Sequence, residues 1–511
     1  MTKAETPGDP LRGRITGRPL TWLIVALMLA QVLSSMNQTV LAPLLPVMSG
    51  ELGGASLMYL VFGAYVLSMA VAVMLYGKGG DLVDRKTLMT LAVVVFVVGS
   101  TIAALAPSVG QLIVGRFVQG VGGGGIVVLA QAIVAAAVAP QLRGKYVAIM
   151  NTVYGFASVG GPLLGGWLAD GPGWRWAFWI SLPVGALAVV IIARAMPSAA
   201  PAPRAPGLRV DAAGAALMCV ATSSVVLMLT WGGTHRPWSD PWIIALAALA
   251  AVSVCALLVV ERHASDPLIP PVLFLDRNFV LPSVAGLLLG IVMLGVVANL
   301  PTYLQMAAGV SAATSGAIMI PMIFCMTIAG LIAGQRMSRT GRSRWMLTGG
   351  AGTAALATAL LARLVDHVSP WSVGALIGLL GTGLGFSMIM VVVVAQNAFP
   401  DSLISTVTGV SNYARQIGMA VGATAVGGIF TSLLLGELRD TVRPDSAVLA
   451  GFNDLTPALV AALPTADRLA LTAAYTHAYS TVFLWLAPCA LVAAVCLAFV
   501  REEQRSSPPP T

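Results

Sequence analysis

The sequence predicts an all-α protein that crosses a membrane about fourteen times, in two six-helix halves with two extra helices between them. Three observations indicate this fold class. Apolar residues make up 58% of the 511 residues and charged residues only 9%. The apolar residues fall into long runs, and one Gly-rich, basic segment occurs twice at matching places. A soluble domain carries about 25% charged residues, so this chain has too few to cover a water-facing surface.

Each apolar run is long enough for a membrane-spanning helix, which needs about 20 residues. Unsatisfied backbone amides are costly in lipid, and the alternation typical of barrel strands is absent, so the runs are expected to be helices. The runs are 21–46, 57–76, 88–107, 111–138, 145–169, 176–195, 211–231, 241–260, 278–303, 312–336, 345–364, 371–398, 404–435 and 478–500.

The repeated basic segment divides the chain. It reads GKGGDLVDRK from Gly77 to Lys86, and a degraded copy, GQRMSRTGR, runs from Gly334 to Arg342. If each copy joins the second and third helices of a six-helix half, the substrate path lies at the interface of the halves. The expected parts are a tail 1–20, an N-terminal bundle 21–195, a linker 196–210, two extra helices 211–262, a loop 263–277, a C-terminal bundle 278–500 with an outer loop 436–477, and a tail 501–511.

The distribution of basic residues predicts the orientation. With the N-terminus inside, most of the 28 Lys and Arg residues fall in inner segments. Cations in short loops stay on the cytoplasmic side, so both tails are predicted to be cytoplasmic. The protein is also expected to lie in the plasma membrane and to be a monomer. The net charge of +8 then reflects topology rather than nucleic-acid binding. The outer segments hold mainly Arg175, Arg236, Arg439, Arg443 and Arg468.

The sequence offers no chemistry for an enzyme, so no cofactor or metal is expected. No convergent Ser/His/Asp set, phosphate loop or ATPase module is recognisable. The glycine run Gly122 to Gly125 lies within a span and lacks a following Lys-Ser/Thr. The cysteines fall inside apolar runs without metal-ligand spacing. They are Cys219, Cys255, Cys325, Cys489 and Cys496.

Four segments carry a family resemblance. They are the hairpin Gly77–Lys86, RFVQGVGGGG from Arg116, GFASVGGPLLGG from Gly155, and WRWAFWISLPVG from Trp174. Each is weak alone, because Gly-rich strings are common in spanning helices, but all four occur in order on the expected spans. Together they resemble the major facilitator superfamily, and within it the fourteen-helix drug:proton antiporters, over nearly the whole chain. The resemblance implies export of lipophilic drugs, antibiotics or metabolites by alternating access, linked to protons.

The resemblance also implies residue roles. In the family the hairpin latches the halves together on the inner side when the carrier faces outward, and Asp81, Arg85 and Lys86 occupy its positions here. The alternative is a turn that only sets topology. Asp84 stands where the family usually has Gly. Arg116 matches an arginine tied to proton or substrate coupling, the alternative being a structural cation satisfied by helix carbonyls.

Two further motifs have structural interpretations. The fifth-span motif implies close helix packing against the tenth span rather than ligand binding. Its residues are Gly161, Pro162, Gly165 and Gly166. Trp174, Arg175 and Trp176 are predicted to lie at the outer interface, where an aromatic anchor in the membrane surface is favoured over substrate contact.

One feature of the family is missing. Asn37 stands where the fourteen-helix antiporters usually carry an aspartate, and no Asp or Glu falls at mid-depth in any predicted span. A proton-coupled carrier normally needs a titratable group there, so coupling would use a rim carboxylate such as Asp81 or a proton on the substrate. Alternatively, a misplaced span boundary would let Asp211 or Glu261 reach inward. The histidines lie in loops or at span ends, at His235, His263, His367 and His477.

The predicted cavity is neutral to positive. Its polar candidates are expected to line the path together with Met and aromatic side chains. Such a cavity favours neutral or anionic lipophiles over strongly cationic drugs. The alternatives are a lipid or metabolite carrier with weak or no proton coupling and, less favoured, a non-transporting receptor. The candidates are Asn37, Gln119, Asn151, Tyr154, Asn299, Tyr303, Gln305, Asn412 and Arg415.

Overall fold

The computed structural model describes most of the chain, and its regular structure is almost entirely helical in the described ranges. The described residues are 18–501 except 42–43, 45–47, 49–50, 53–57, 139, 197–211, 233–235, 265–266, 268, 311, 365–368 and 442–463.

The described helices fall on all fourteen predicted apolar runs, because long apolar segments bury their backbone polarity best as helices. Eleven of them are long and apolar enough to cross a membrane, and α9 carries a shorter apolar stretch. The helices are α1 (Arg18–Thr39), α3 (Met58–Leu82), α4 (Arg85–Ala104), α5 (Val109–Ala137), α6 (Pro140–Asp170), α7 (Trp176–Trp179), α8 (Ser181–Ala195), α9 (Ala212–Trp231), α10 (Pro241–His263), α11 (Arg277–Met306), α12 (Ala312–Thr340), α13 (Arg344–Leu364), α14 (Pro370–Asn397), α15 (Ile404–Thr441) and α18 (Thr465–Ala498), with short 3-10 turns η3 (Pro271–Leu275) and η4 (Asp401–Leu403).

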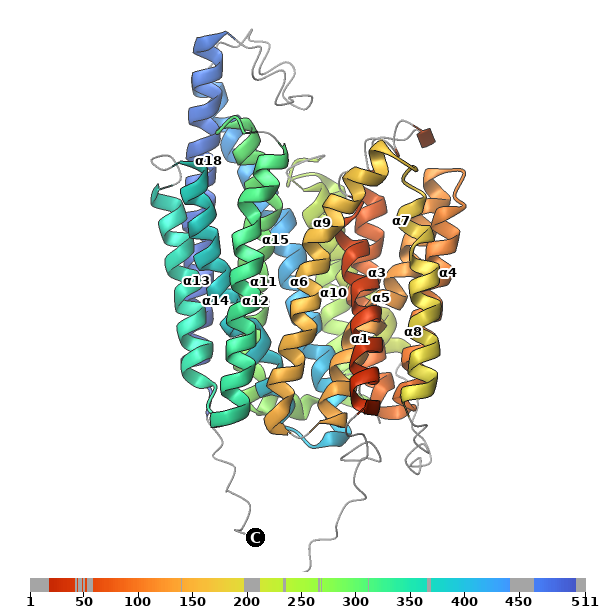
Figure 1. The fold of residues 1–511 in the computed structure, drawn as a ribbon. Helices are drawn as coiled ribbons and strands as arrows, with labels where there is room; N and C mark the ends of the chain where they lie inside the picture. Colours follow the sequence, from red (N-terminus) through yellow and green to blue (C-terminus); the bar gives the residue numbers. More distant parts are fainter. Residues whose placement is uncertain are drawn as a thin grey trace, which may run out of the picture.

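Two bundles stand side by side (Figure 1). The N-terminal bundle comprises α1 to α8, with α5 packed against α3 and α4, and the C-terminal bundle comprises α11 to α18, with α14 packed against α12 and α13. The bundles meet most extensively where α6 packs on α12 and where α3 packs on α15. The fold class predicted from the sequence is therefore confirmed.

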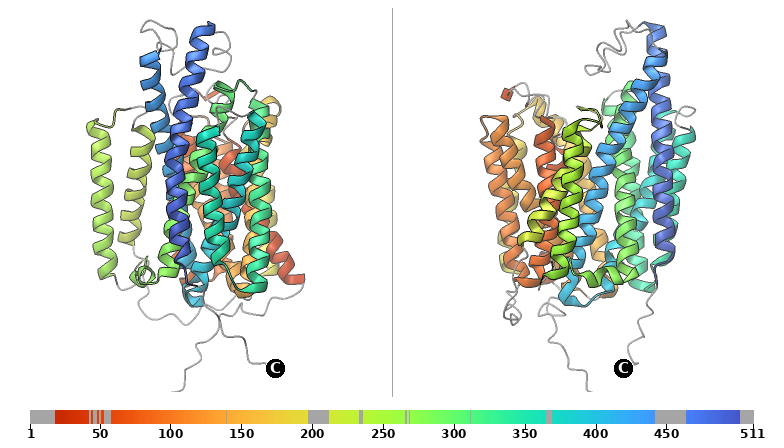
Figure 2. Two further views of the ribbon diagram at one scale, coloured as in Figure 1. Left: turned by 90° about the vertical axis from the view of Figure 1, so that its left-hand side faces the viewer. Right: turned by 180° about the vertical axis from the view of Figure 1, so that it is seen from behind.

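The two extra helices lie outside this pair of bundles. Helix α9 packs against both α3 and α15, so it covers one of the seams between the bundles. Helix α10 packs mainly on α9, and the two yellow-green helices stand to one side of the molecule in Figure 2 (left). Most large apolar side chains of α10 are exposed, as expected of a helix that faces lipid.

Tryptophans mark both ends of the bundles. Helix α1 begins and α18 ends at the same end of the molecule, the lower end in Figure 1, which is called here the predicted inner end. Exposed Trp22 and Trp345 lie at this end, and exposed Trp167, Trp242 and Trp371 lie at the opposite, predicted outer end. Two such belts are typical of membrane–water interfaces.

Two helices extend into the predicted outer loop 436–477. Helix α15 continues to Thr441 and α18 begins at Thr465, so both helices extend above the rest of the bundle (Figures 1 and 2). Exposed His477, predicted to lie in a loop or at a span end, is part of α18. The stretch from Thr465 mixes Ala and Leu with polar residues, so it forms helix without the continuous apolar run by which a span is recognised.

Candidate functional site

Arg116 lies on α5, where this helix packs closely against α3 and α4. Helix α5 carries glycines on the faces that meet α3 and α4. A Cβ added to Gly120 would lie 2.4 Å from Tyr65 O, and one added to Gly122 would lie 2.3 Å from Phe96 N. Because no side chain larger than hydrogen fits there, the three helices approach closely, and 0% of the surface of Arg116 is exposed.

Neutral groups satisfy the Arg116 guanidinium. Its Nη1 donates to Gln119 Oε1, its Nη2 donates to Asn37 O at 3.1 Å, and its Nε donates to Val61 O at 3.4 Å. The guanidinium also lies over the Tyr65 ring, 4.2 Å from the ring centroid. Carbonyls from α1 and α3 and an aromatic face thus take the place of a carboxylate.

Asn37 and Gln119 complete this network. Gln119 Nε2 donates to Asn37 Oδ1 at 3.1 Å and to Ser100 Oγ at 2.7 Å. Asn37 Nδ2 donates to Ser181 Oγ at 3.1 Å and to Leu33 O at 3.0 Å. Asn37 and Gln119 have no exposed surface in this conformation. Their hydrogen bonds go to protein groups, so a place for them on the substrate path stays a prediction.

Within the described helices, every Asp or Glu lies within five residues of a helix end. Glu261 lies at the inner end of α10, where its Oε2 accepts from Ile269 N at 3.1 Å, so it does not reach into the centre of the bundles. Asp211 is outside the described residues. The described helices therefore hold no carboxylate at mid-depth, as the sequence predicts.

The bundles are joined by hydrogen bonds near the predicted inner end. Arg85 Nε donates to Ser405 Oγ at 3.2 Å, and Arg143 Nη1 donates to Asn397 Oδ1 at 3.2 Å. A third bond, from Asn412 Nδ2 on α15 to Gln131 Oε1 on α5 at 2.8 Å, lies deeper. This group of contacts is called the inner seam below.

Backbones also touch at the inner seam. A Cβ on Gly77 would lie 2.8 Å from Gly409 Cα and 3.0 Å from Ser405 O. The Gly77–Lys86 hairpin therefore lies between the bundles, where the latch role expects it. The Asp81 side chain is outside the described set.

Two other residues of the hairpin act within the N-terminal bundle. Lys86 Nζ donates to Ala193 O at 2.9 Å, at the end of α8. Asp84 is the N-cap of α4 and accepts from Lys86 N and Thr87 N. The structure thus gives Asp84 a capping role in place of the Gly that the family usually carries.

The fifth-span motif needs one correction. Helix α6 packs on α12, the tenth predicted span, as the resemblance implies. That contact involves Gly155, whose added Cβ would lie 3.5 Å from Ile323 and Thr327 side-chain atoms. Gly161 instead faces α1, because a Cβ added to it would lie 2.0 Å from Thr39 Oγ1. The motif therefore also contributes to helix packing within the N-terminal bundle. Gly165 is buried, whereas the Pro162 and Gly166 surroundings are outside the described set.

The structure describes the side chains of only some of the remaining predicted cavity residues. In the C-terminal bundle, Asn299 Nδ2 donates to Gly295 O at 2.9 Å, and the Tyr303 ring lies 5.2 Å from the Tyr479 ring. Gln305 is half-buried, as is Arg415. The side chains of Asn151 and Tyr154 are outside the described set.

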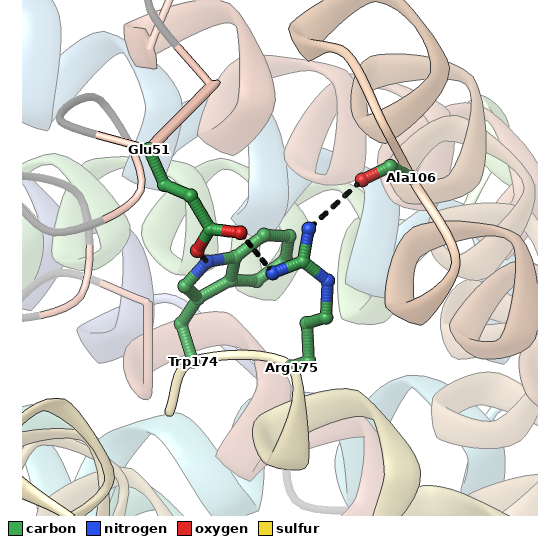
Figure 3. A network of polar contacts seen from close by, with 4 residues as sticks. All are labelled: Glu51, Ala106, Trp174 and Arg175. Atoms are coloured by element: carbon green, nitrogen blue, oxygen red, sulfur yellow. Dashed lines mark hydrogen bonds and ion pairs between the residues drawn. The ribbon is translucent and has the colours of Figure 1, made fainter. Parts of the chain in front are cut away.

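Trp174 lies at the outer end as predicted, but the surface-anchor role predicted for it is wrong. The residue is 1% exposed, and its Nε1 donates to Glu51 Oε2 at 2.6 Å (Figure 3). Arg175 donates to the other oxygen of Glu51 and to Ala106 O, and stacks on the Trp174 ring. Trp176, by contrast, is exposed. These hydrogen bonds, from Arg175 first and Trp174 second, lower the pKa of Glu51 below its ordinary value.

Sequence reasoning missed several partners in these networks. Ser100, Ser181 and Ser34 bind the polar side chains of α1, α3 and α5, yet a single Ser within an apolar run gives no pattern. Glu51 follows the first apolar run of the sequence. Its only sequence signal is that an acid in a short outer loop needs a cationic partner nearby.

Two helical bundles that meet along a polar inner seam, around membrane-embedded polar residues, define a carrier that works by alternating access. Residues 27–423 match the family model of the Major Facilitator Superfamily, and the chain belongs to this family. It is a multi-span membrane transporter of small molecules.

Named relatives cover most of the chain. It is 31% identical over 480 residues to an uncharacterized MFS-type transporter of Mycobacterium tuberculosis (strain ATCC 25618 / H37Rv), covering 94% of this chain and 69% of the relative. It is 31% identical over 424 residues to the multidrug transporter protein MdtP of Bacillus subtilis (strain 168), covering 83% and 78%. Against an efflux pump, FUS6 of Gibberella moniliformis (strain M3125 / FGSC 7600), identity is 29%, covering 80% and 74%.

Two solved structures share the fold. The proton:xylose symporter XylE superposes with a TM-score of 0.60 at 14% identity, covering 94% of this chain and 96% of the symporter. The human organic anion transporter MFSD10 superposes with a TM-score of 0.58 at 15% identity, covering 93% and 100%. At these identities the likeness concerns the fold alone.

Proposed function

We propose that this transporter exports lipophilic drugs, antibiotics or metabolites across the plasma membrane, with both tails cytoplasmic and with a link to the proton gradient. The multidrug and efflux names of its relatives support drug export. The excess of basic residues in the segments at the end where α1 begins supports the orientation.

The observation that carries the choice of substrate is the charge of the interior. The middle parts of the described helices hold the cations Arg116 and Arg415 and many amides, and no carboxylate. A cationic drug would find no counter-charge in this region. A neutral lipophile needs none, and an anionic lipophile can pair with the arginines. We therefore expect strongly cationic drugs to be poor substrates and neutral or anionic lipophiles to be good ones.

Proton linkage then has two possible routes. One uses Asp81 at the inner rim, next to the contacts that join the bundles. The other uses a proton that the substrate carries itself. In both routes Arg116 positions the N-terminal bundle, because its hydrogen bonds all go to that bundle.

The test is uptake into proteoliposomes with and without an imposed pH gradient, using fluorescent lipophiles of similar size that are neutral, anionic or cationic. Asp81→Asn should abolish the dependence on the gradient if the rim route operates. Asp84→Asn is the matched control, because it removes the other carboxylate of the hairpin while Asn still caps a helix well. Ethidium-like cations emerging as clearly the best substrates would contradict the charge argument.

A second candidate is a carrier of lipids or metabolites with weak or no proton coupling. The neutral amide of Asn37 favours it, since this position holds two hydrogen bonds to Gln119 and Ser181 without any group that titrates. Uptake that is equally fast with and without the pH gradient, for wild type and Asp81→Asn alike, would favour this candidate over the proton-linked exporter.

A further inference from the structure

Arg415, like Arg116, is a cation well inside a described helix, but it differs from Arg116 in exposure. It lies eleven residues after Ile404, the first residue of α15. At 1.5 Å per residue it is about 16 Å from the inner end of the helix, roughly half of a 30 Å hydrocarbon layer. Arg415 is half-buried, whereas Arg116 has no exposed surface. Of these two cations, Arg415 is the one that keeps exposed surface in this conformation.

Arg415 contacts Asn412, which belongs to the inner seam. Its Nη2 donates to Asn412 Oδ1 at 2.7 Å. The amide nitrogen of the same Asn412 donates to Gln131 Oε1 across the bundles at 2.8 Å and to Thr408 O at 2.9 Å. A cation at the amide oxygen polarises the amide and strengthens donation from its nitrogen. The Arg415 contact therefore supports the cross-bundle bond.

We infer that Arg415 binds the anionic group of an amphiphilic substrate and that this binding loosens the Asn412–Gln131 contact between the bundles. The inference rests on the proposed export function and makes its substrate class narrower: lipophilic molecules that carry a carboxylate, sulfonate or similar oxyanion.

The physical reason is competition for the guanidinium. A charged oxyanion accepts from a guanidinium about twice as strongly as a neutral amide oxygen does. When Arg415 turns to the substrate, Asn412 loses its donor and with it the polarisation that favours the bond to Gln131. The inner seam then depends on the rim contacts of Arg85 and Arg143. Substrate charge would thus favour the inward-open state, in which an exporter loads its substrate, without any titrating protein group at that depth.

Binding measurements test the first half of the inference. The probes are pyrenebutyrate, a lipophilic carboxylate, and its methyl ester, which differs only in charge. Purified Arg415→Met protein should bind pyrenebutyrate at least tenfold more weakly than wild type and the ester within twofold. Arg363→Met, which removes an exposed cation near the end of α13, is the control and should change neither affinity. An equal loss for both probes, or no loss for either, overturns the inference.

Distance measurements test the second half. Spin labels at Leu142→Cys and Arg342→Cys, both exposed at the inner ends of different bundles, report the seam in a background without the five native cysteines. Pyrenebutyrate should lengthen this distance in wild type but not in Arg415→Met, and Gln131→Met should lengthen it without ligand. A distance that does not respond to pyrenebutyrate overturns the link to the seam.

Two outcomes separate this inference from the proposed function. Wild type that neither binds nor transports any lipophile disproves the export function itself. Wild type that transports both probes, with Arg415→Met unchanged in its preference, disproves only the role of Arg415. An anionic lysophospholipid is a further probe. If it alone shows the dependence on Arg415, the ligand is a lipid headgroup and the assignment to an exported amphiphile is wrong.

Discussion

Arg116 and Arg415 show two ways of keeping a guanidinium inside a membrane protein. Arg116 lies seven residues after the first residue of α5 and Arg415 eleven residues after that of α15, and no Asp or Glu lies as far from a helix end in the described helices. Arg116 is sealed by carbonyls, an amide and an aromatic ring. Arg415 keeps exposed surface and holds an asparagine that bridges two bundles. We infer from this difference in burial that Arg116 is a structural cation and that Arg415 is available to a ligand.

The partners of the two arginines point to the same distinction. The groups that bind Arg116 come from α1, α3 and α5, all within the N-terminal bundle. The chain of contacts from Arg415 ends on Gln131 of the other bundle. In alternating access the bundles move largely as rigid bodies. The network of Arg116 should then persist through the cycle, and the contact of Asn412 should form and break.

The largest expected effect comes from Arg116→Met. The change leaves Gln119 Oε1 and Asn37 O without this donor, whereas Val61 O keeps its bond within α3, and each unsatisfied buried group costs about 1–3 kcal/mol. We expect a loss of about 3 kcal/mol or more, seen as a strongly lowered Tm or failure to purify as a monodisperse protein. Arg415→Met, measured in the same thermal assay, should lower Tm far less. Equal losses for the two variants would show that the contrast in burial has no energetic meaning.

Gly77→Ala should act on the seam and spare the N-terminal network. The new Cβ would lie 2.8 Å from Gly409 Cα, and backbone atoms cannot move aside as a flexible side chain can. We expect the inner end to be held open and transport to fall at least tenfold, with spin-label distances across the seam lengthened. Gly79→Ala is the control, because its Cβ would meet only Leu88 Cδ1 at 3.4 Å. Normal closure in Gly77→Ala would contradict the packing argument.

Much of the fold could be predicted from the sequence, because continuous apolar runs and a repeated hairpin are local sequence patterns that need no knowledge of contacts between distant residues. All fourteen runs fall on described helices. The start of α18 at Thr465 was missed, since its outer part lacks an apolar run. The orientation of Gly161 toward α1 was missed because a glycine motif says that a neighbour is close, without saying which helix it is.

Only part of the candidate site could be predicted from the sequence. Asn37, Gln119 and Arg116 could be identified as polar residues in apolar runs. Their mutual hydrogen bonds could not be predicted, because they join positions about 80 residues apart. The same holds for Gln131 and Asn412, 281 residues apart. Sequence position indicates depth in the membrane, but the rotation of each helix about its axis decides which polar groups meet.

Asn37→Asp should give the sealed network the titratable group that it lacks. The new carboxylate would accept from Gln119 Nε2, and the Ser181 hydroxyl can rotate to donate to it. We expect transport driven by a pH gradient to rise about threefold relative to transport without one. Asn278→Asp, at the inner start of α11, is the matched control and should change nothing. An unchanged gradient dependence in Asn37→Asp would mean that this position is not where protons couple.

The smallest effect concerns Arg175, which lies at the outer rim beside the carboxylate of Glu51. Hydrogen bonds from Arg175 and Trp174 lower the pKa of Glu51. Because the folded-state pKa is the lower one, the stabilisation is complete above the ordinary value of 4.5 and is lost as pH falls through the folded-state pKa. Glu51→Gln should therefore lower Tm near pH 7, and the difference from wild type should shrink below about pH 4.5.

The expected loss at neutral pH is below about 1 kcal/mol, because both side chains of this ion pair are roughly a third or more exposed and solvent screens them. Added salt at pH 7 should reduce the difference further. Arg116→Met should by contrast keep its full effect in salt, since that guanidinium has no exposed surface. A salt-sensitive loss at Arg116, or a salt-insensitive one at Glu51, would reverse the assignment of which arginine is sealed from solvent.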